Sequence, residues 1–358
     1  MKYEYWFANI KGISNRRKVE IREKFSVIKE LYCLDEEKMG AYGIKENEKK
    51  LIVESIKSWQ LEQEYKKVNE KEVRCVPFHH WDYPKKLKYI SSPPYMLYLR
   101  GRMPDPNKKT IAIVGARECS PYGERMAREF AEALALHDVQ IVSGMARGID
   151  SASQRGALDV GGTSFGILGC GVDLCYPREE IGLYQELIAR GGVISEYPIN
   201  TSPLRQNFPA RNRIISGMAD AILVMEAKEK SGSLITADMA LDQGKDVYAL
   251  PGPVNSMLSR GCHSLIKQGA EILISTEELL QDLGVKLCNI AKKSDSEKIL
   301  LELSENLVYG GLDLQPQSLD ELIRKTGLSV PDVLNELVRL EMMGVVKEIS
   351  KNNYVKLK

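Results

Sequence analysis

The chain has 358 residues, of which 43% are hydrophobic and 28% charged, as is typical of a globular protein with two or three domains. Its 50 basic and 49 acidic residues leave a net charge of +1, so a nucleic-acid site has to be a local concentration of positive charge. The longest apolar runs fall far short of the roughly 18 residues of a membrane span, and the N-terminus has no apolar signal segment. We therefore expect a cytoplasmic protein with no membrane partner.

Residues 1–70 predict a small helical module, because apolar side chains such as Val19, Ile21 and Phe25 recur at roughly helical spacing among many Lys and Glu. Residues 71–109 are divided by prolines and glycine into segments too short for a regular layer. We expect these residues to form an extended lead-in and a linker to the next domain.

Between residues 110 and 287, short β-branched runs alternate with segments long enough for crossover helices. This alternation predicts βαβ units and a mostly parallel sheet with helices on both faces. The expected fold class is α/β, with an extended, doubly wound, Rossmann-like core. The expected strands are Thr110–Val114, Gln140–Ser143, Thr163–Leu168, Gly192–Glu196, Ala221–Glu226, Asp246–Leu250 and Ile272–Ile274.

The remaining residues predict a polar linker and a last small domain. Residues 288–297 are polar and form the linker, and residues 298–358 form a winged helix. The pattern there is three helices followed by a hairpin around Lys351-Asn352-Asn353. The helices are expected at Ile299–Leu303, Ser318–Thr326 and Pro331–Met343, and the hairpin at Val345–Lys358.

Small and hydroxyl residues follow four of the predicted strands of the core. In an open parallel sheet, ligands bind outside the carboxyl ends of the strands. Glycine permits close backbone approach, and the N–H groups at a helix start favour anions, so these loops favour phosphate. For any one loop, a tight turn alone explains the glycines. The residues are Gly115, Ser143, Gly144, Gly148, Gly169, Gly171, Ser231, Gly232 and Ser233.

Arginines gather at the same edge and predict a basic groove. A planar guanidinium suits phosphate, and several along a groove follow a nucleic-acid backbone. Phe208, Tyr176 and Tyr197 lie at strand ends among these charges, where they either stack on bases or belong to the core. The arginines are Arg117, Arg147, Arg205, Arg211 and Arg213.

Several motifs of enzymes are missing. The turn after the first core strand lacks G-x-G-x-x-G, and the chain has no G-x-x-x-x-G-K-[ST], so we expect neither a nicotinamide nor an ATP cofactor. No histidine forms a recognisable motif with a nucleophile, and Asp150 is either a base or a helix cap. The seven scattered cysteines and four histidines predict reduced thiols and no metal site. We expect a binding protein with no catalytic residue.

Four motifs follow the predicted strands of the core in a fixed order: Gly115-Ala-Arg117, Ser143–Asp150, Phe208–Ile215 and Ser231–Ala237. Further motifs before and after them are Tyr83–Leu87, Pro93-Pro94, Leu250-Pro-Gly252 and Leu265–Ala270. In this order and on these strand ends, the motifs resemble the DNA-processing protein A (DprA/Smf) family. One departure is Gly-Ala-Arg in place of the family's usual Gly-Ser-Arg, which removes a hydroxyl group and keeps the charge.

The resemblance implies a core that binds single-stranded DNA, hands it to the recombinase RecA and forms a homodimer. It also implies a SAM or helix-hairpin-helix-like module at residues 1–70. Arg117 resembles the principal DNA-contacting arginine, and Leu265 and Ile266 fall in the segment that resembles the dimer and RecA-contact region. The pocket residues implied by the matching motifs are Ser143, Gly144, Gly148, Phe208, Arg211, Asn212 and Arg213.

Two other functions stay open at this stage. Nucleotide hydrolases that cleave N-glycosidic bonds share such a core, but their Pro-Gly-Gly-x-Gly-Thr run is replaced here by Pro251-Gly-Pro-Val-Asn255. The second alternative is a regulator whose winged helix binds duplex DNA. Competition between a short duplex and oligo-dT of equal length separates this alternative from single-strand binding.

Overall fold

The computed structural model describes residues 1–285, 303–312 and 316–357. The chain forms two compact units. The first contains residues 1–117 and 127–287, and the second contains residues 118–126 together with the C-terminal part of the chain. Among the described residues, no helix is both long and apolar enough to cross a membrane.

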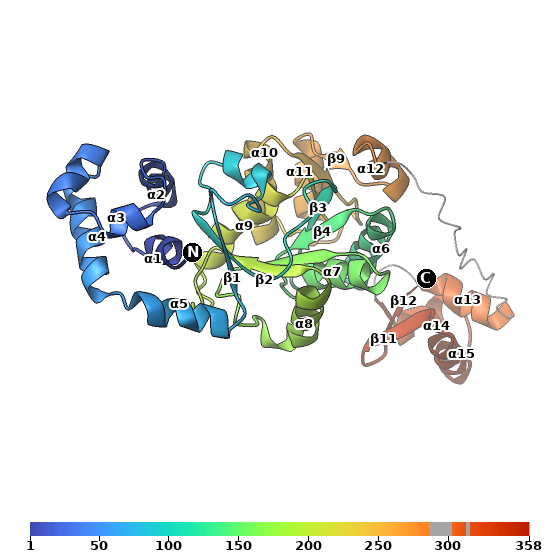
Figure 1. Ribbon diagram of the computed structural model, residues 1–358. Helices are drawn as coiled ribbons and strands as arrows, with labels where there is room; N and C mark the ends of the chain where they lie inside the picture. The colour runs from blue at the N-terminus through green and yellow to red at the C-terminus, as the bar shows by residue number, and fades with distance from the viewer. Residues whose placement is uncertain (286–302, 313–315, 358) are drawn as a thin grey trace. The chain divides into compact units, whose positions relative to one another are not determined.

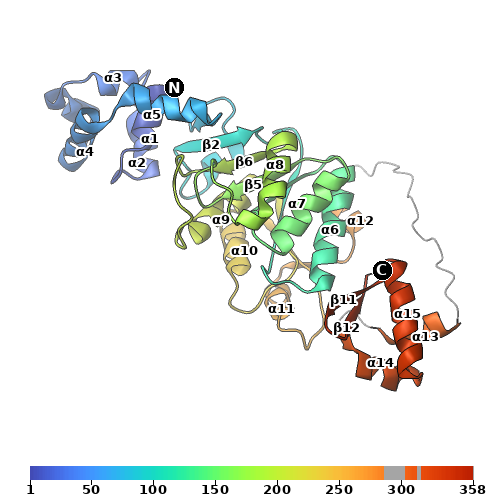
Figure 2. The ribbon, with the colours of Figure 1, turned by 90° about the horizontal axis from the view of Figure 1, so that it is seen from below.

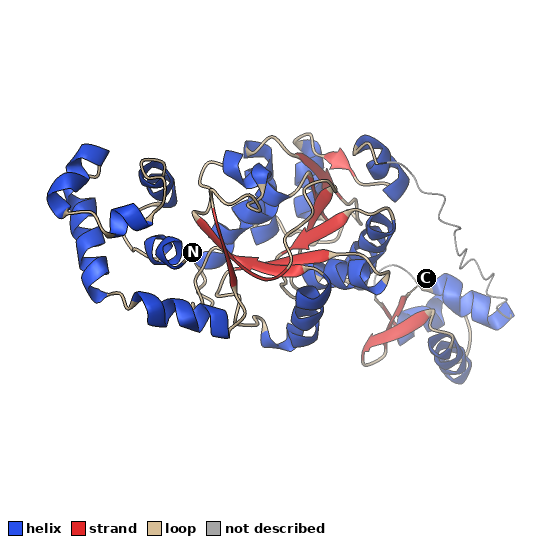
Figure 3. Cartoon of the chain, in the orientation of Figure 1, coloured by secondary structure: helices blue, strands red, loops and turns tan. Residues whose placement is uncertain are grey.

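A nine-stranded sheet forms the centre of the first unit (Figure 3). The strands lie in the order β1-β2-β6-β5-β4-β3-β7-β8-β9, and those from β3 to β9 are parallel. The strands are β1 (Arg74–Pro77), β2 (Met96–Gly101), β3 (Thr110–Val114), β4 (Gln140–Ser143), β5 (Ser164–Leu168), β6 (Gly192–Ser195), β7 (Ala221–Val224), β8 (Asp246–Ala249) and β9 (Glu271–Ile272).

Helices cover both faces of the sheet, with α6, α7 and α8 on one face and α9, α10 and α11 on the other (Figure 1). The helices of the sheet layers are α6 (Pro121–Leu136), α7 (Ile149–Asp159), α8 (Ile181–Arg190), α9 (Asn207–Met218), α10 (Gly232–Asp242), α11 (Arg260–Lys267) and α12 (Thr276–Asp282). Strands β3 to β7 are buried along their whole length, because apolar side chains on both faces meet a helix layer. The predicted α/β fold and its seven parallel strands are confirmed.

The strand order reverses between β3 and β7. From β3 the chain proceeds through β4 and β5 to β6, and it then returns through α9 to β7 on the other side of β3. The carboxyl ends of β3 and β7 therefore diverge, and a crevice opens where helices from both faces begin. This topology fixes the position of the site.

The extended lead-in expected at residues 71–109 is wrong, because this segment contains two strands of the main sheet. Strand β2 pairs antiparallel with β6, and β1 pairs antiparallel with β2 and forms the edge. The side chains of β2 alternate between two apolar clusters. Met96 and Tyr98 belong to a cluster shared with the N-terminal helices, and Leu97 and Leu99 belong to the cluster under α9 to α11. Burial on both faces is what turns this short segment into a strand.

The N-terminal module packs beside β2, and its helices lie together in both views (Figure 1 and Figure 2). Its core is aromatic, with Tyr5, Trp6 and Phe7 of α1 nearly inaccessible to solvent. Tyr5 contacts Tyr98 of β2 edge to face, at 6.0 Å between ring centroids. The helices are α1 (Lys2–Ala8), α2 (Asn15–Arg22), α3 (Lys29–Tyr32), α4 (Glu46–Ser58) and α5 (Leu61–Glu70), with 3-10 helices at Glu36–Tyr42, Lys85–Tyr89 and Arg178–Glu180 along the unit.

The second unit contains the winged helix, which confirms the fold expected at the C-terminus. Ser318 and Glu321 form a reciprocal capping box that fixes the start of α14. The linker expected at residues 288–297 lies outside the described residues, as does most of the helix expected at Ile299–Leu303. The elements are α13 (Leu303–Gly311), β10 (Gln317–Ser318), α14 (Leu319–Thr326), α15 (Val330–Met342), β11 (Val346–Ser350) and β12 (Asn353–Lys356).

Candidate functional site

A cleft of about 590 Å³ lies at the carboxyl edge of the sheet, where the strand order reverses. It collects side chains that follow five strands, from β3 to β7. Three guanidinium groups and one carboxylate line it, so the cleft carries a net positive charge. The lining residues are Val114, Gly115, Arg117, Ala146, Asp150, Tyr176, Arg205, Phe208, Pro209, Arg211, Asn212, Ile215, Ser231, Gly232, Ser233, Ile235 and Thr236.

Arg211 of α9 lies at the floor of the cleft and is nearly buried, with 4% of its surface exposed. Its guanidinium donates hydrogen bonds to the carbonyl oxygens of Gly144, at 2.9 Å, and Ile167. These bonds tie α9 to the ends of β4 and β5. Burial lowers the pKa of Arg211 to about 10, which keeps the group cationic at neutral pH. Arg211 is therefore a fixed positive charge with its donors directed into the protein.

Asp150, at the start of α7, faces the same buried region. Its carboxylate accepts hydrogen bonds from the backbone N–H groups of Gly144 (3.1 Å) and Ala146 (3.4 Å). Burial raises the pKa of Asp150, while the positive charge of Arg211 and these backbone bonds act in the opposite direction. Of the two interpretations from the sequence, a base or a cap, the geometry matches a carboxylate that holds the β4–α7 loop.

Arg117 lies at the mouth of the cleft and is exposed. Its guanidinium carbon lies 5.7 Å from the centroid of the Phe208 ring, and that ring lies 5.4 Å from the ring of Tyr176. Arg117 forms no hydrogen bond or ion pair with the residues that the structure describes, so its donors are open to a ligand. Gly169 makes this arrangement possible, because a Cβ there would lie 2.9 Å from the Phe208 ring.

The start of α10 forms the opposite wall. Ser231 caps the helix, with its hydroxyl accepting from the Ser233 N–H at 3.3 Å and lying 2.7 Å from the Ser233 hydroxyl. Asn212 of α9 donates from its side-chain amide to the Gly232 carbonyl oxygen at 3.2 Å. The positive end of the α10 dipole therefore faces the cleft beside two hydroxyl groups.

Comparison with known proteins agrees with this geometry. A family model described as DNA recombination-mediator protein A matches residues 74–284, more than half of the chain. A second model, the DprA winged helix domain, matches residues 294–350. The chain belongs to the DprA/Smf family. The family expected from the sequence motifs is thereby confirmed.

Relatives in the DprA/Smf family align with most of the chain. Protein Smf of Escherichia coli is 39% identical over 284 residues, which cover 77% of this chain and 75% of that protein. The X-ray structure of DNA processing protein A from Streptococcus pneumoniae superimposes with a TM-score of 0.68 at 30% identity and covers 80% of this chain and 99% of that one. A structure of DNA processing protein A from Helicobacter pylori, described for its single-stranded DNA binding mode, gives a TM-score of 0.54 at 28% identity, covering 59% and 95%.

The structure brings together eight of the thirteen DNA-binding or phosphate-binding residues expected from the strand-end loops and from the family resemblance. These eight line the cleft: Gly115, Arg117, Phe208, Arg211, Asn212, Ser231, Gly232 and Ser233. Ser143 and Gly144 lie beneath it, where the Ser143 hydroxyl donates to the Ile113 carbonyl oxygen at 2.6 Å. Gly148 permits the turn into α7, because its φ is +75° and a Cβ would lie 2.4 Å from the Ala116 oxygen. These three residues shape the cleft without lining it.

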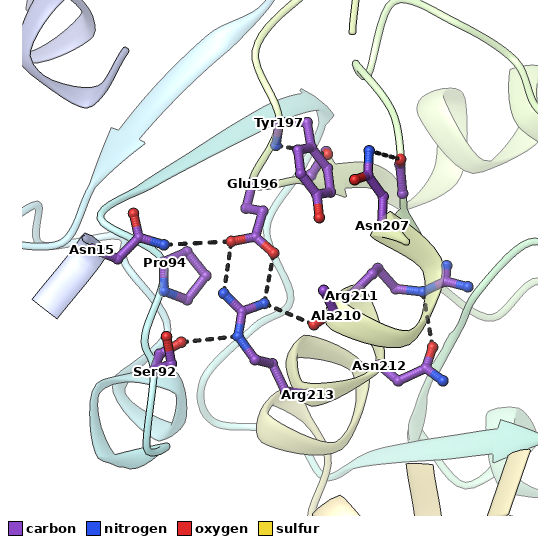
Figure 4. Close-up of polar contacts among 12 residues, drawn as sticks. Asn15, Ser92, Pro94, Glu196, Tyr197, Asn207, Ala210, Arg211, Asn212 and Arg213 are labelled. Carbon is purple, nitrogen blue, oxygen red and sulfur yellow. Dashed lines mark hydrogen bonds and ion pairs between the residues drawn. The ribbon is translucent and has the colours of Figure 1, made fainter. Parts of the chain in front are cut away.

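Two of the expected cations are absent from the lining, which corrects the basic groove as the sequence predicted it. Arg147 is exposed and forms an ion pair with Glu179. Arg213 is bound to Glu196, with both distances 2.6 Å. Arg211 and Arg213 point in opposite directions (Figure 4), because residues two apart on a helix are separated by about 200°.

The prediction that Leu265 contacts a partner at the surface does not match its position. This side chain of α11 is 4% exposed and belongs to the apolar cluster under α9 to α11, so it is not a surface contact of the monomer. Ile266 is partly buried against the same cluster.

Arg205 and Tyr176 complete the cleft. Arg205 is one of the predicted groove arginines and Tyr176 one of the predicted strand-end aromatics, and neither belongs to a motif that carries the family resemblance. Tyr176 is 41% exposed, and Arg205 is exposed with no ion pair among the described residues. Position after a strand was the sequence signal that could find them.

Proposed function

We propose that this chain binds single-stranded DNA in the cleft and does not cleave it. The observation that carries the proposal is the open guanidinium of Arg117 beside the neighbouring rings of Phe208 and Tyr176, which are tilted by 33°. A cation next to an aromatic platform matches the alternation of phosphate and base in a single strand, whereas the bases of a duplex are stacked and inaccessible. The structure of DNA processing protein A from Helicobacter pylori, described for its single-stranded DNA binding mode, supports single-stranded DNA as the ligand.

The charges of the winged helix favour the cleft over a duplex-binding regulator. Helix α15 occupies the position of a recognition helix, which has to approach phosphates in a DNA groove. Its charged side chains are Asp332, Glu336, Arg339 and Glu341, so the helix carries an excess of negative charge. We infer that the main DNA affinity of the chain resides in the core.

Binding without cleavage agrees with the single carboxylate of the lining. Asp150 is 7% exposed and already accepts two backbone hydrogen bonds, so it is not placed to take a proton from water. A glycosidic hydrolase needs such an acid or base next to the scissile bond. Incubation with nucleoside monophosphates is therefore expected to release no free base.

The direct test is fluorescence anisotropy with labelled oligo-dT and a duplex of equal length. Wild-type protein is expected to prefer oligo-dT, with affinity falling steeply as salt rises, because each neutralised phosphate releases counterions. Arg117→Glu is expected to weaken binding about 10- to 100-fold, since a phosphate contact becomes a repulsion. Its melting temperature should change little, because Arg117 is exposed.

Arg102→Glu is the matched control. Arg102 is also exposed, but it lies next to the start of β6, at the opposite edge of the sheet, where it donates to the Arg190 carbonyl oxygen. This reversal changes the net charge equally and is expected to leave oligo-dT affinity within about twofold. Equal losses in both variants would mean that total charge, and not the cleft, determines binding.

We further infer that the bound strand is passed to RecA in the cytoplasm. The support is the family resemblance and the description of the family as a recombination mediator. The expected result is that the protein speeds RecA assembly on oligo-dT that is already covered by a single-strand-binding protein. The Arg117→Glu variant should lack this effect, and an equal effect would remove the cleft from the process.

We also propose a homodimer formed through the β9 edge in place of Leu265. Among the described residues, strand β9 ends the sheet. Ile272 within β9 and Ile274 just after it are 46% and 67% exposed. An open edge with apolar side chains can pair with a second copy by two-fold symmetry. Ile274→Asp is expected to give a folded monomer in light scattering, and Leu265→Asp an unfolded chain. A dimer that persists in Ile274→Asp places the interface elsewhere.

A further inference from the structure

Arg213 and Glu196 form a polar junction on the side of α9 that faces away from the cleft (Figure 4). The two nitrogens Nη1 and Nη2 of Arg213 each donate to one carboxylate oxygen of Glu196, at 2.6 Å. Its Nε donates to the Ser92 carbonyl oxygen at 3.0 Å. Two parallel bonds between planar groups leave the guanidinium little freedom.

The junction connects four parts of the chain. Glu196 directly follows β6, Ser92 belongs to the segment between β1 and β2, and Arg213 lies in the middle of α9. The side-chain amide of Asn15, from the N-terminal module, lies 3.5 Å from a Glu196 oxygen. The side chains of Arg213 and Glu196 are 14% and 11% exposed, so solvent screens the pair only in part.

Helix α9 is thus held on two sides. Arg211 fixes one side to the ends of β4 and β5, and Arg213 fixes the other side to the end of β6. Between these anchors, Phe208 and Asn212 face the cleft. A helix with its side chains is about 10–12 Å across, so a rotation of about 15° moves a side-chain tip by about 1.5 Å. Such a shift is enough to disturb the Arg117, Phe208 and Tyr176 arrangement.

We propose that Arg213 and Glu196 are positioning residues: their ion pair fixes the rotation of α9 and thereby the direction in which Phe208 faces the DNA, and neither side chain contacts the strand. This inference rests on the proposed function. It assigns the two arginines of the Arg211-Asn212-Arg213 sequence to anchoring and leaves phosphate binding to Arg117 and Arg205.

The alternative, that Arg213 contacts a phosphate, predicts the opposite effect of one substitution. Glu196→Gln removes the negative charge that holds Arg213. If Arg213 contacted the strand, this change would free its charge and strengthen binding. If the pair positions α9, the same change loosens the helix and weakens binding.

The experiment measures oligo-dT affinity of the full-length chain across a series of salt concentrations. Glu196→Gln is expected to lower affinity about 3- to 10-fold, and Arg213→Ala about 10-fold. Arg213→Lys should have an affinity between those of the wild type and Arg213→Ala, because it keeps the charge and one donor. The dependence of log affinity on log salt should stay as in the wild type, since no phosphate contact is lost. Arg117→Glu, in contrast, should reduce that slope by about 0.7 for each lost contact.

Arg100→Ala is the control for a merely structural effect. Arg100, on β2, is partly buried and donates to the Tyr184 hydroxyl at 3.0 Å, far from α9 along the chain. It is expected to lower the melting temperature and to leave the affinity of the folded protein unchanged. An equal loss of affinity in Arg100→Ala and Arg213→Ala would reduce the junction to general stability and overturn the proposal.

Tighter binding by Glu196→Gln, or a slope reduced by about 0.7 in Arg213→Ala, would also overturn the positioning role and make Arg213 a DNA contact. In either case the cleft would still bind DNA. Failure of the proposed function itself would be visible separately, as wild-type protein that does not bind oligo-dT or as Arg117→Glu that binds normally.

Discussion

Replacement of Arg211 by methionine tests whether Arg211 anchors α9 or contacts DNA. Arg211→Met keeps much of the side-chain volume but removes two hydrogen bonds to the carbonyl oxygens of Gly144 and Ile167. It also leaves the buried carboxylate of Asp150 without its neighbouring positive charge. Loss of one member of a buried charge pair typically costs about 3–5 kcal/mol. For a unit of this size, this corresponds to a fall in melting temperature of roughly 6–20 °C.

Thermal unfolding followed by circular dichroism at pH 7 measures this fall in melting temperature. The double variant Arg211→Met/Asp150→Asn is the matched control, because it removes the unpaired charge and should recover part of the loss. Arg117→Glu should show the reverse pattern, with nearly normal stability and weak DNA binding. The reasoning is refuted if Arg211→Met melts within about 2 °C of the wild type and yet loses DNA binding, since Arg211 would then be a ligand contact.

Two further predictions follow from buried groups. A Cβ at Gly144 would lie 2.5 Å from an Arg211 nitrogen and 2.7 Å from an Asp150 oxygen. Gly144→Ala should therefore lower the free energy of unfolding by about 1–3 kcal/mol, measured by denaturant unfolding, and weaken oligo-dT binding, measured by anisotropy. Burial lowers the pKa of Lys18 from 10.5 to about 8. Between these two pH values the unfolded chain binds more protons than the folded one. The free energy of unfolding should therefore rise with pH in this range, by up to about 3 kcal/mol. Urea unfolding of Lys18→Met across this pH range should show no such rise. A rise equal to that of the wild type would contradict the assignment of this pH dependence to Lys18.

The sequence predicted the parallel core because each of its strands is a short, continuously apolar run between helix-length segments. It did not predict that β1 and β2 join the sheet. The pairing of β1 with β2 and of β2 with β6 depends on contacts distant in the sequence. Tyr98 of β2 is buried in a cluster shared with the N-terminal module, where it contacts Tyr5.

The site was predictable at the level of loops, because position after a strand determines which residues meet at the edge of the sheet. The role of each arginine was less predictable. Helical periodicity alone separates Arg211 from Arg213, once α9 is known to include both. The burial of Arg211 and the pairing of Arg213 with Glu196 depend on tertiary contacts that no local pattern encodes.

Photo-crosslinking tests the central claim most directly. On irradiation, the carbon–iodine bond of 5-iodouracil in oligo-dT breaks and the uracil carbon bonds to an aromatic ring stacked on the base, with loss of hydrogen iodide. Mass spectrometry then identifies the residue. The cleft predicts adducts at Phe208 or Tyr176, which vanish in Arg117→Glu. Trp81 and Tyr89 are far more exposed, at 84% and 89%, and serve as internal controls. Adducts confined to those two side chains would contradict the account.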